Sequence, residues 1–204
     1  MSEKTKIIDY TTKQFLKNGF YKVSMDQLAS GMRISKKTIY KYFLSKTLLV
    51  ENVIRVFQSK IKRDLEHIVE NGDCLTQIRE LSKYFTNLSL KINQKMLTDL
   101  TKHQPELWKQ IDSFRTDIIS NVWSTIINQG KSEKIIIDVP NEIIIGVVTS
   151  AIRGVINPIF LKKNSIDISE AFEVTFKIII SGILTEKGKI AFKKQEWETK
   201  NEIN

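Results

Sequence analysis

The seven residues from Lys36 to Tyr42 interleave three lysines with two tyrosines. An ordinary amphipathic helix keeps its lysines on a solvated face and its aromatic rings in the core, so this mixture needs another reason. Lysine ammonium groups bind phosphates or guanine edges, and tyrosine hydroxyl groups bind phosphates. These residue types therefore favour a surface that binds nucleic acid. Two simpler interpretations stay open: the tyrosines fill a small core, or the lysines belong to a solvated surface.

The excess of positive charge is concentrated around this segment. The chain has 204 residues and a formal net charge of +9. Residues 1–50 hold ten Lys and Arg against three Asp and Glu, a net of +7, whereas the remaining 154 residues hold 22 against 20. A basic terminal module favours a polyanionic partner. A lysine-rich surface without such a partner would spread the excess more evenly.

Capping signals divide the first part of the chain into short helices. Apolar spacing predicts a first helix over about residues 4–17, and Gly19 is suited to its C-terminal cap. Ser24 and Gln27 form a capping-box pattern that predicts a second helix, which ends near Met32.

The segment with the lysines and tyrosines follows as a third helix. Ser35 can cap it, and residues 36–42 continue it. On this helix Ile39 and Phe43 share one face and should point into a core, whereas the lysines lie on other faces. Two short helices joined by about three residues predict a helix-turn-helix. A fourth helix should begin at Lys46.

The run from Ala29 to Leu49 resembles the DNA-binding signature of tetracycline-repressor-type (TetR family) regulators. That signature reads roughly as alanine, two variable positions and A-G-V-S-K-G-T-L-Y-x-Y-F-x-x-K-x-x-L. The chain matches it, together with an upstream pair at Gly19-Phe20, at Ser35, Lys36, Thr38, Tyr40, Tyr42, Phe43 and Lys46. It departs at Arg33 and Lys37, where the family usually has glycine. We expect Arg33 to adopt a backbone conformation that costs about 1 kcal/mol.

The resemblance implies an all-α protein that acts as a dimeric, sequence-specific transcriptional regulator. It implies an N-terminal three-helix helix-turn-helix DNA-binding domain at 1–46, a larger helical ligand-binding and dimerisation domain at 47–186, and a charged C-terminal extension at 187–204. The expected partners are a second copy and a near-palindromic double-stranded DNA operator, from which a small apolar or aromatic effector would release a repressor. The expected DNA-binding residues are Ser24, Ser35, Lys36, Lys37, Thr38, Tyr40, Lys41, Tyr42 and Lys46.

Periodicity predicts further helices in the larger domain, since only 3 Pro and 8 Gly interrupt the chain. Gly130 should end one of them, Asn141 should cap another, and Ile135–Ile137 should form a packed connection. The expected helices span about 46–71, 73–92, 95–103, 105–129, 142–160 and 169–184.

Two functional surfaces are expected on these helices. Large apolar groups, together with the family's habit of enclosing a pocket, predict an effector site with few polar groups; the alternative is that they only fill the core. Its expected residues are Phe57, Phe85, Ser89, Met96, His103, Trp108, Phe114, Arg115 and Trp123. The last two long helices are apolar on more than one side, which favours a dimer over a monomeric bundle. The expected interface residues are Gly146, Ser150, Gly154, Phe172, Phe176, Ile179, Ile180 and Ile183.

The sequence carries no recognisable catalytic or metal motif. Cys74 is the single cysteine, and His67 and His103 are distant in the chain, so we expect no metal, no cofactor and no enzyme activity. The N-terminus lacks an apolar signal segment, which favours a cytoplasmic location without membrane binding. Two alternatives stay open: a DNA-binding regulator controlled by a partner protein, and a helical adaptor on an anionic membrane. Short capped helices argue against the adaptor.

Overall fold

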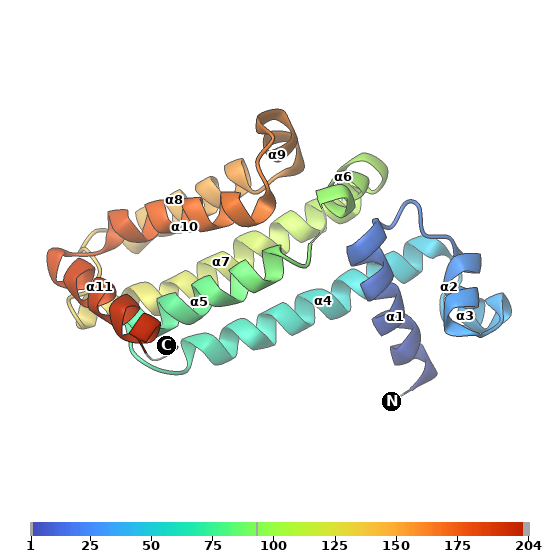
Figure 1. Cartoon of the computed structure of the whole chain (residues 1–204), viewed down its shortest axis with the longest axis horizontal. Coiled ribbons are helices and arrows are strands. Elements are labelled where there is room, and N and C mark those ends of the chain that lie inside the picture. Colours follow the sequence, from blue (N-terminus) through green and yellow to red (C-terminus); the bar gives the residue numbers. More distant parts are fainter. Residues whose placement is uncertain (1, 93, 202–204) are drawn as a thin grey trace. The chain divides into compact units, whose positions relative to one another are not determined.

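The computed structural model describes residues 2–92 and 94–201, and its regular structure is helical throughout this part of the chain (Figure 1). The predicted all-α fold is confirmed. The helices are α1 (Glu3–Asn18), α2 (Met25–Met32), α3 (Lys36–Tyr42), α4 (Lys46–Val69), α5 (Cys74–Ser89), α6 (Gln94–His103), α7 (Pro105–Ser132), α8 (Asn141–Val155), α9 (Pro158–Asn164), α10 (Ile168–Ile183) and α11 (Glu186–Asn201).

The chain divides into two compact units that each combine separate segments. The first unit contains Met1–Lys62 and Leu90–Phe114, and the second contains Arg63–Ser89 and Arg115–Asn204. Helices α4 and α7 each contribute to both units. The helix-turn-helix therefore lies in a unit larger than the segment 1–46, because α6 and the start of α7 pack with it. The predicted domain boundaries stay a prediction.

Helices in the first unit begin and end close to the capping residues that the sequence predicts. Gly19 ends α1 with a φ of 74°, a conformation that side chains disfavour. Ser24 and Gln27 form the complete capping box of α2, because each side chain accepts a hydrogen bond from the other residue's backbone N–H. Ser45 accepts a hydrogen bond from the backbone N–H of Leu48 at the start of α4, at 3.1 Å. These caps set the end of α1 and the starts of α2 and α4.

The core of the first unit joins the first four helices to α6. Ile39 and Phe43 are fully buried in it, as predicted from their spacing. Met96 and Leu100 of α6 belong to the same cluster, and Trp108 packs against its edge. The segment around α6 is therefore part of the body that carries the helix-turn-helix.

In the second unit α10 packs against α5 and α8, with α8 and α10 side by side in Figure 1. Its buried face includes the aromatic pair Phe172 and Phe176, whose ring centroids lie 5.6 Å apart. An isolated antiparallel bridge between Ile136 and Leu184 joins the connection after α7 to the end of α10. The expected packed connection at Ile135–Ile137 thus includes one bridge and no longer strand.

Several helix ends differ from the prediction. Helix α5 ends at Ser89 and does not reach residue 92. Helix α7 continues through Gly130 to Ser132. A Cβ atom at Gly130 would lie 2.7 Å from the sulfur of Cys74, so this glycine permits close packing and does not stop the helix.

The helix predicted over 142–160 is two helices. Asn157 caps α9 by accepting a hydrogen bond from the backbone N–H of Phe160, and Pro158 occupies the first turn, where its missing N–H does no harm. Asn141 does not cap α8; its side-chain amide donates to Asn128 at 2.7 Å. Asn157 and Pro158 therefore begin a new helix at a place where the apolar pattern continues without a break.

Part of the predicted extension at 187–204 is ordered as α11, and residues 202–204 lie outside the described residues. Lys187 donates to the backbone carbonyl of Glu133 at 2.9 Å, and the N–H of Gly188 donates to the hydroxyl of Thr185. The start of this segment is therefore held against the connection that follows α7.

No single helix among residues 2–92 and 94–201 is long and apolar enough to cross a membrane; α8 and α9 reach that length and composition only as a pair bent by 58°.

Candidate nucleic-acid interface

Helices α2 and α3 are joined by a tight turn whose backbone geometry sets the angle between the two helices. The C-terminal cap of α2 is Arg33, with φ 56° and ψ 40° in the left-handed region. Its N–H donates to Ser30, and the N–H of Ile34 donates to Ala29, both at 3.0 Å. The expected unfavourable backbone at Arg33 is confirmed, and these two hydrogen bonds hold it in place.

The outer face of α3 carries the chemistry that binds nucleic acids. Lys36, Lys37, Tyr40 and Lys41 are all exposed, whereas Ile39 between them is buried. Tyr40 is therefore not core padding. We call these four residues, with Thr38, the basic face. It offers ammonium groups, a phenol and a hydroxyl to one partner, which matches the donors that proteins use for phosphates and base edges.

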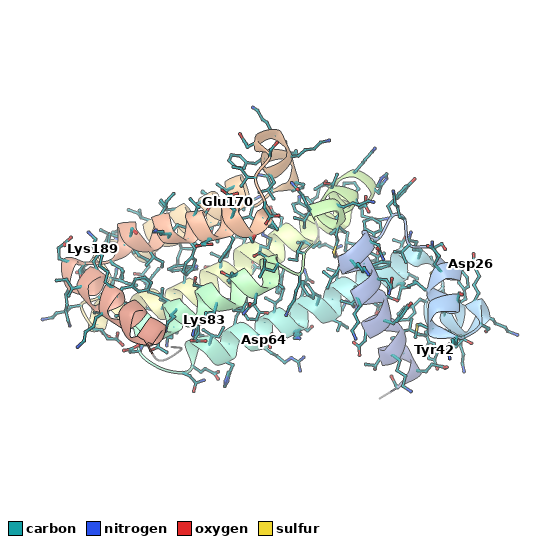
Figure 2. All side chains as sticks on the ribbon, in the orientation of Figure 1. Asp26, Tyr42, Asp64, Lys83, Glu170 and Lys189 are labelled. Atoms are coloured by element: carbon teal, nitrogen blue, oxygen red, sulfur yellow. The ribbon has the colours of Figure 1, made fainter. Side chains whose placement is uncertain are left out.

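Two residues of the predicted set bind acidic side chains within the first unit. The Lys36 ammonium lies 2.9 Å from the carboxylate of Asp26, and this hydrogen bond raises the pKa of Lys36. The hydroxyl of Tyr42 donates to Glu3 at 3.0 Å, which raises the pKa of Tyr42. Figure 2 marks Asp26 on α2 and Tyr42 on α3. Neither acidic partner was predicted, because separations of 10 and 39 positions leave no local pattern.

Lys46 begins α4 in a partly enclosed place. Its ammonium donates to the backbone carbonyl of Tyr21 at 3.0 Å and lies 5.9 Å from the centroid of the Phe20 ring. Burial lowers the pKa of Lys46, and the nearby Asp99 carboxylate opposes that effect. The side chain thus ties α4 to the loop before α2, beside the helix-turn-helix.

The predicted hydroxyl residues cap helices. Ser24 accepts from the N–H of Gln27, and Ser35 accepts from the N–H of Thr38 at 3.0 Å. The hydroxyls of Ser35 and Thr38 also lie 2.8 Å apart. Each of these groups keeps a second hydrogen-bonding valence, so a phosphate contact is compatible with the cap.

The nine residues predicted for an effector pocket are divided between the two units. Phe57, Met96, His103, Trp108 and Phe114 belong to the first unit; Phe85, Ser89, Arg115 and Trp123 belong to the second. In the second unit, Phe85 lies 5.3 Å from Phe172 and Trp123 lies 6.2 Å from Phe176, measured between ring centroids. We call these four rings the aromatic cluster.

Two polar residues of that set have other contacts. The ring of His103 stacks on that of Tyr21, with centroids 4.0 Å apart and planes at 12°. The guanidinium of Arg115 donates to the carbonyls of Ile152 and Ile156, both at 3.3 Å, at the C-terminal end of α8. His103 therefore helps to hold the loop before α2, and Arg115 binds the C-terminal end of α8; their predicted role in orienting an effector stays a prediction.

The predicted dimer residues fall on two different faces. Phe172, Phe176, Ile179, Ile180 and Ile183 are buried against other helices of the second unit, so they are core residues and the prediction for them is corrected. A Cβ atom added at Gly146 or Gly154 would meet nothing within 4 Å, so these positions are open. The exposed apolar side chains beside them were missed: Ile143, Val147, Val174 and Ile178.

Periodicity reveals a second apolar register on α10 but does not identify it as the exposed one. The buried residues of α10 follow one register, and Val174 and Ile178 follow another, four positions apart. Helix α10 is apolar in both registers, and sequence alone does not say which one the chain itself covers.

A capped helix-turn-helix that presents a basic face defines the class of the protein, a DNA-binding regulator. Residues 7–53 match the family described as bacterial regulatory proteins, tetR family. The helix-turn-helix transcriptional regulator YvaF of Bacillus subtilis (strain 168) is 24% identical over 181 residues, which cover 86% of this chain and 93% of YvaF. The DNA-binding part of the chain is thus similar to that of tetR-family regulators, and most of the chain is similar to a helix-turn-helix transcriptional regulator.

Solved structures of such regulators share the fold. A transcriptional regulator from Cytophaga hutchinsonii ATCC 33406 has a TM-score of 0.70 and 21% identity, over 89% of this chain and 98% of that one. A TetR/AcrR family regulator from Thermobifida fusca has a TM-score of 0.62 and 19% identity, over 88% and 97%. A regulator from Saccharomonospora viridis, solved in complex with choline, has a TM-score of 0.69 and 13% identity, over 90% and 98%.

Proposed function

We propose that the chain is a dimeric, ligand-responsive repressor that reads its operator with the basic face of α3. The observation that carries this proposal is the exposure of Lys36, Lys37, Tyr40 and Lys41 on a helix whose opposite side is buried. An α-helix fits the major groove of B-DNA, where lysine donates to guanine and tyrosine to phosphate. Lys46 is proposed to add a phosphate contact at the edge of this surface.

The residues of the basic face differ in the part that we assign to them. Lys36, Lys37 and Thr38 stand in the first turn of α3 and are proposed to reach base edges, because recognition helices commonly contact bases with their N-terminal residues. Tyr40 and Lys46 are proposed to bind phosphates, with Lys41 and Tyr42 beside them. Ser24 and Ser35 would add hydroxyl contacts while they keep their capping hydrogen bonds.

Dimerisation is proposed through the face that α8 and α10 leave open in the second unit. We define this open face as Ile143, Val147, Val174 and Ile178, with Gly146, Ser150 and Gly154 at its low points. Glycine and serine let two helices approach closely, and the apolar side chains would lose their contact with water. A dimer is needed because α3 alone buries too little surface for specific affinity.

The effector is proposed to bind in the second unit at the aromatic cluster of Phe85, Trp123, Phe172 and Phe176. These rings form an apolar cluster, which suits contact with a small apolar or aromatic molecule. The effector would act through α4 and α7, the helices that belong to both units. It can shift DNA binding only by the difference in its affinity for the DNA-bound and DNA-free states.

A pair of lysine variants tests the proposed DNA surface. Lys37→Ala changes the basic face, and Lys177→Ala removes an exposed lysine from α10 as the matched control. Both variants are titrated against duplex fragments that the wild-type protein selects from a random library. We expect Lys37→Ala to weaken binding or change the preferred sequence, and Lys177→Ala to do neither. Equal behaviour of the two variants would contradict the proposal.

A further inference from the structure

An acidic side chain lies beside the basic face and neutralises one of its lysines. Asp26 stands in the first turn of α2, and its carboxylate accepts a hydrogen bond from Lys36 at 2.9 Å. Residues 1–50 contain only two other acidic residues. A surface that only had to attract phosphates would not keep a carboxylate at this place, because it repels them.

The stability of the fold does not explain this carboxylate. The side chains of Lys36 and Asp26 are 48% and 71% exposed, and ion pairs between such exposed side chains contribute little to stability. Helix α2 already has a complete capping box from Ser24 and Gln27. Asp26 adds a favourable charge at the helix N-terminus, but that effect does not require contact with Lys36.

The effect of the pair on DNA binding is specific. A carboxylate only accepts hydrogen bonds, and the donors that the major groove offers are the amino groups of cytosine and adenine. A phosphate offers none. While Lys36 is bonded to Asp26, it is also less free to turn toward any phosphate that comes near. The pair therefore weakens contact with DNA of arbitrary sequence and gains only where a base presents an amino group.

We infer that Asp26 is a specificity-determining residue, whose carboxylate accepts a hydrogen bond from a cytosine or adenine amino group while it holds Lys36 toward the neighbouring base. This inference rests on the proposed function, since it requires that α3 enters the major groove. It assigns a base-reading role to α2 in addition to α3. The operator should have a cytosine or adenine next to the base that Lys36 contacts.

The experiment compares Asp26→Asn with the wild-type protein on two duplexes. One duplex is a fragment that the wild-type protein selects from a random library, and the other is the same fragment with its sequence scrambled. We expect Asp26→Asn to bind the scrambled duplex more tightly, and the ratio of the two affinities to fall about tenfold, because the neutral amide no longer repels phosphates and no longer holds Lys36 toward its base. The salt dependence on the scrambled duplex should steepen by about one unit, since Lys36 becomes free to bind a phosphate.

Two further variants make the result specific to the pair. Asp9→Asn makes the same change in net charge on the exposed side of α1, and it should leave the affinity ratio unchanged. Adding Lys36→Gln to Asp26→Asn should remove the extra binding to the scrambled duplex, because that binding depends on the released ammonium. The melting temperature of each variant confirms that the helix-turn-helix is folded.

The outcomes separate this inference from the proposed function. If the wild-type protein selects no sequence, the proposed function itself fails. If the wild-type protein selects a sequence but Asp26→Asn keeps the wild-type ratio, or changes it no more than Asp9→Asn does, only the role of Asp26 is overturned. The role of Asp26 would also be overturned if Asp26→Asn kept the wild-type ratio of affinities and only the addition of Lys36→Gln lowered it. Lys36 would then read the base without help from Asp26.

Discussion

The backbone N–H of Tyr21 donates to the carboxylate of Asp99 at 3.1 Å, although 78 positions separate the two residues. The carbonyl of Tyr21 accepts from Lys46, and its ring stacks on His103. Helices α4 and α6 thus hold the loop before α2 through three contacts to Tyr21 within the first unit. A change in α6 would reach α2 through this loop, so we regard Asp99 as a residue that positions the DNA-binding helices.

Replacing Asp99 with alanine should destabilise the protein. Asp99 is only 8% exposed, and the variant would leave the N–H of Tyr21 without its partner, which costs about 1–3 kcal/mol. Urea unfolding measures this loss. Asp99→Asn should retain most of the stability, because its amide oxygen can still accept the hydrogen bond. Equal stability of Asp99→Ala and the wild-type protein would show that this hydrogen bond does not stabilise the fold.

Placing a charge on the open face should separate the proposed dimer. Ile178 is 67% exposed in the single chain, so Ile178→Lys should fold, whereas burying its ammonium in a dimer would be strongly unfavourable. Light scattering after size-exclusion chromatography measures the mass in solution. Ile159→Lys, at an exposed apolar residue of α9, is the control and should stay dimeric. A dimeric Ile178→Lys would place the interface elsewhere.

A substitution on the buried face of α10 should lower the stability of the fold and should not separate the proposed dimer. Phe172→Ala removes a core ring that packs on Phe85 and Phe176, and such truncations cost about 3–5 kcal/mol. We expect a lower melting temperature, with no shift toward a stable, folded monomer. A folded monomer of Phe172→Ala with unchanged unfolding free energy would restore this ring to the dimer interface.

An effector should report its place through tryptophan fluorescence. Trp123 belongs to the aromatic cluster of the second unit, and Trp108 packs in the first unit. The measurement uses variants that all carry Trp197→Phe. Adding Trp108→Phe leaves Trp123 as the remaining tryptophan, and a hydrophobic compound that releases DNA should change its emission. A compound that releases DNA but changes emission only in Trp123→Phe would move the site to the first unit.

Alkaline pH should weaken the fold in part through Cys74. Burial raises the pKa of its thiol from the ordinary value of 9.0 to about 12. Because the folded pKa is the higher one, this group stabilises the fold fully below pH 9.0, and the contribution falls as the pH rises from there toward 12. Urea unfolding at several pH values from 8 upward should therefore show a smaller loss of unfolding free energy for Cys74→Ala than for the wild-type protein. Some loss should remain in the variant, because burial also raises the pKa of Tyr84.

The sequence predicted the helix-turn-helix well because its signals are local. The capping box at Ser24, the glycine cap at Gly19 and the alternation of buried and exposed residues on α3 all act within a few positions. The break between α8 and α9 was equally local, at Asn157 and Pro158, but the apolar pattern on both sides obscured it.

What the sequence could not predict depends on contacts between distant segments. Asp26 meets Lys36 only because the turn at Arg33 sets the angle between α2 and α3. Helix α10 is apolar in two registers, and only the packing of α5 and α8 decides that Phe176 is inside and Ile178 outside. The glycine at 130 is required by the sulfur of Cys74, which lies 56 positions earlier in the chain.

Selection of DNA from a random duplex library tests the central claim most directly. The wild-type protein should enrich a near-palindrome with two equivalent half-sites, because two copies of α3 are proposed to read it. Lys37→Ala should enrich a different sequence, whereas Lys46→Ala should enrich the same sequence with weaker binding and a salt slope lower by about one unit. Enrichment of one asymmetric half-site by a monomer, or no enrichment by the wild-type protein, would contradict the account.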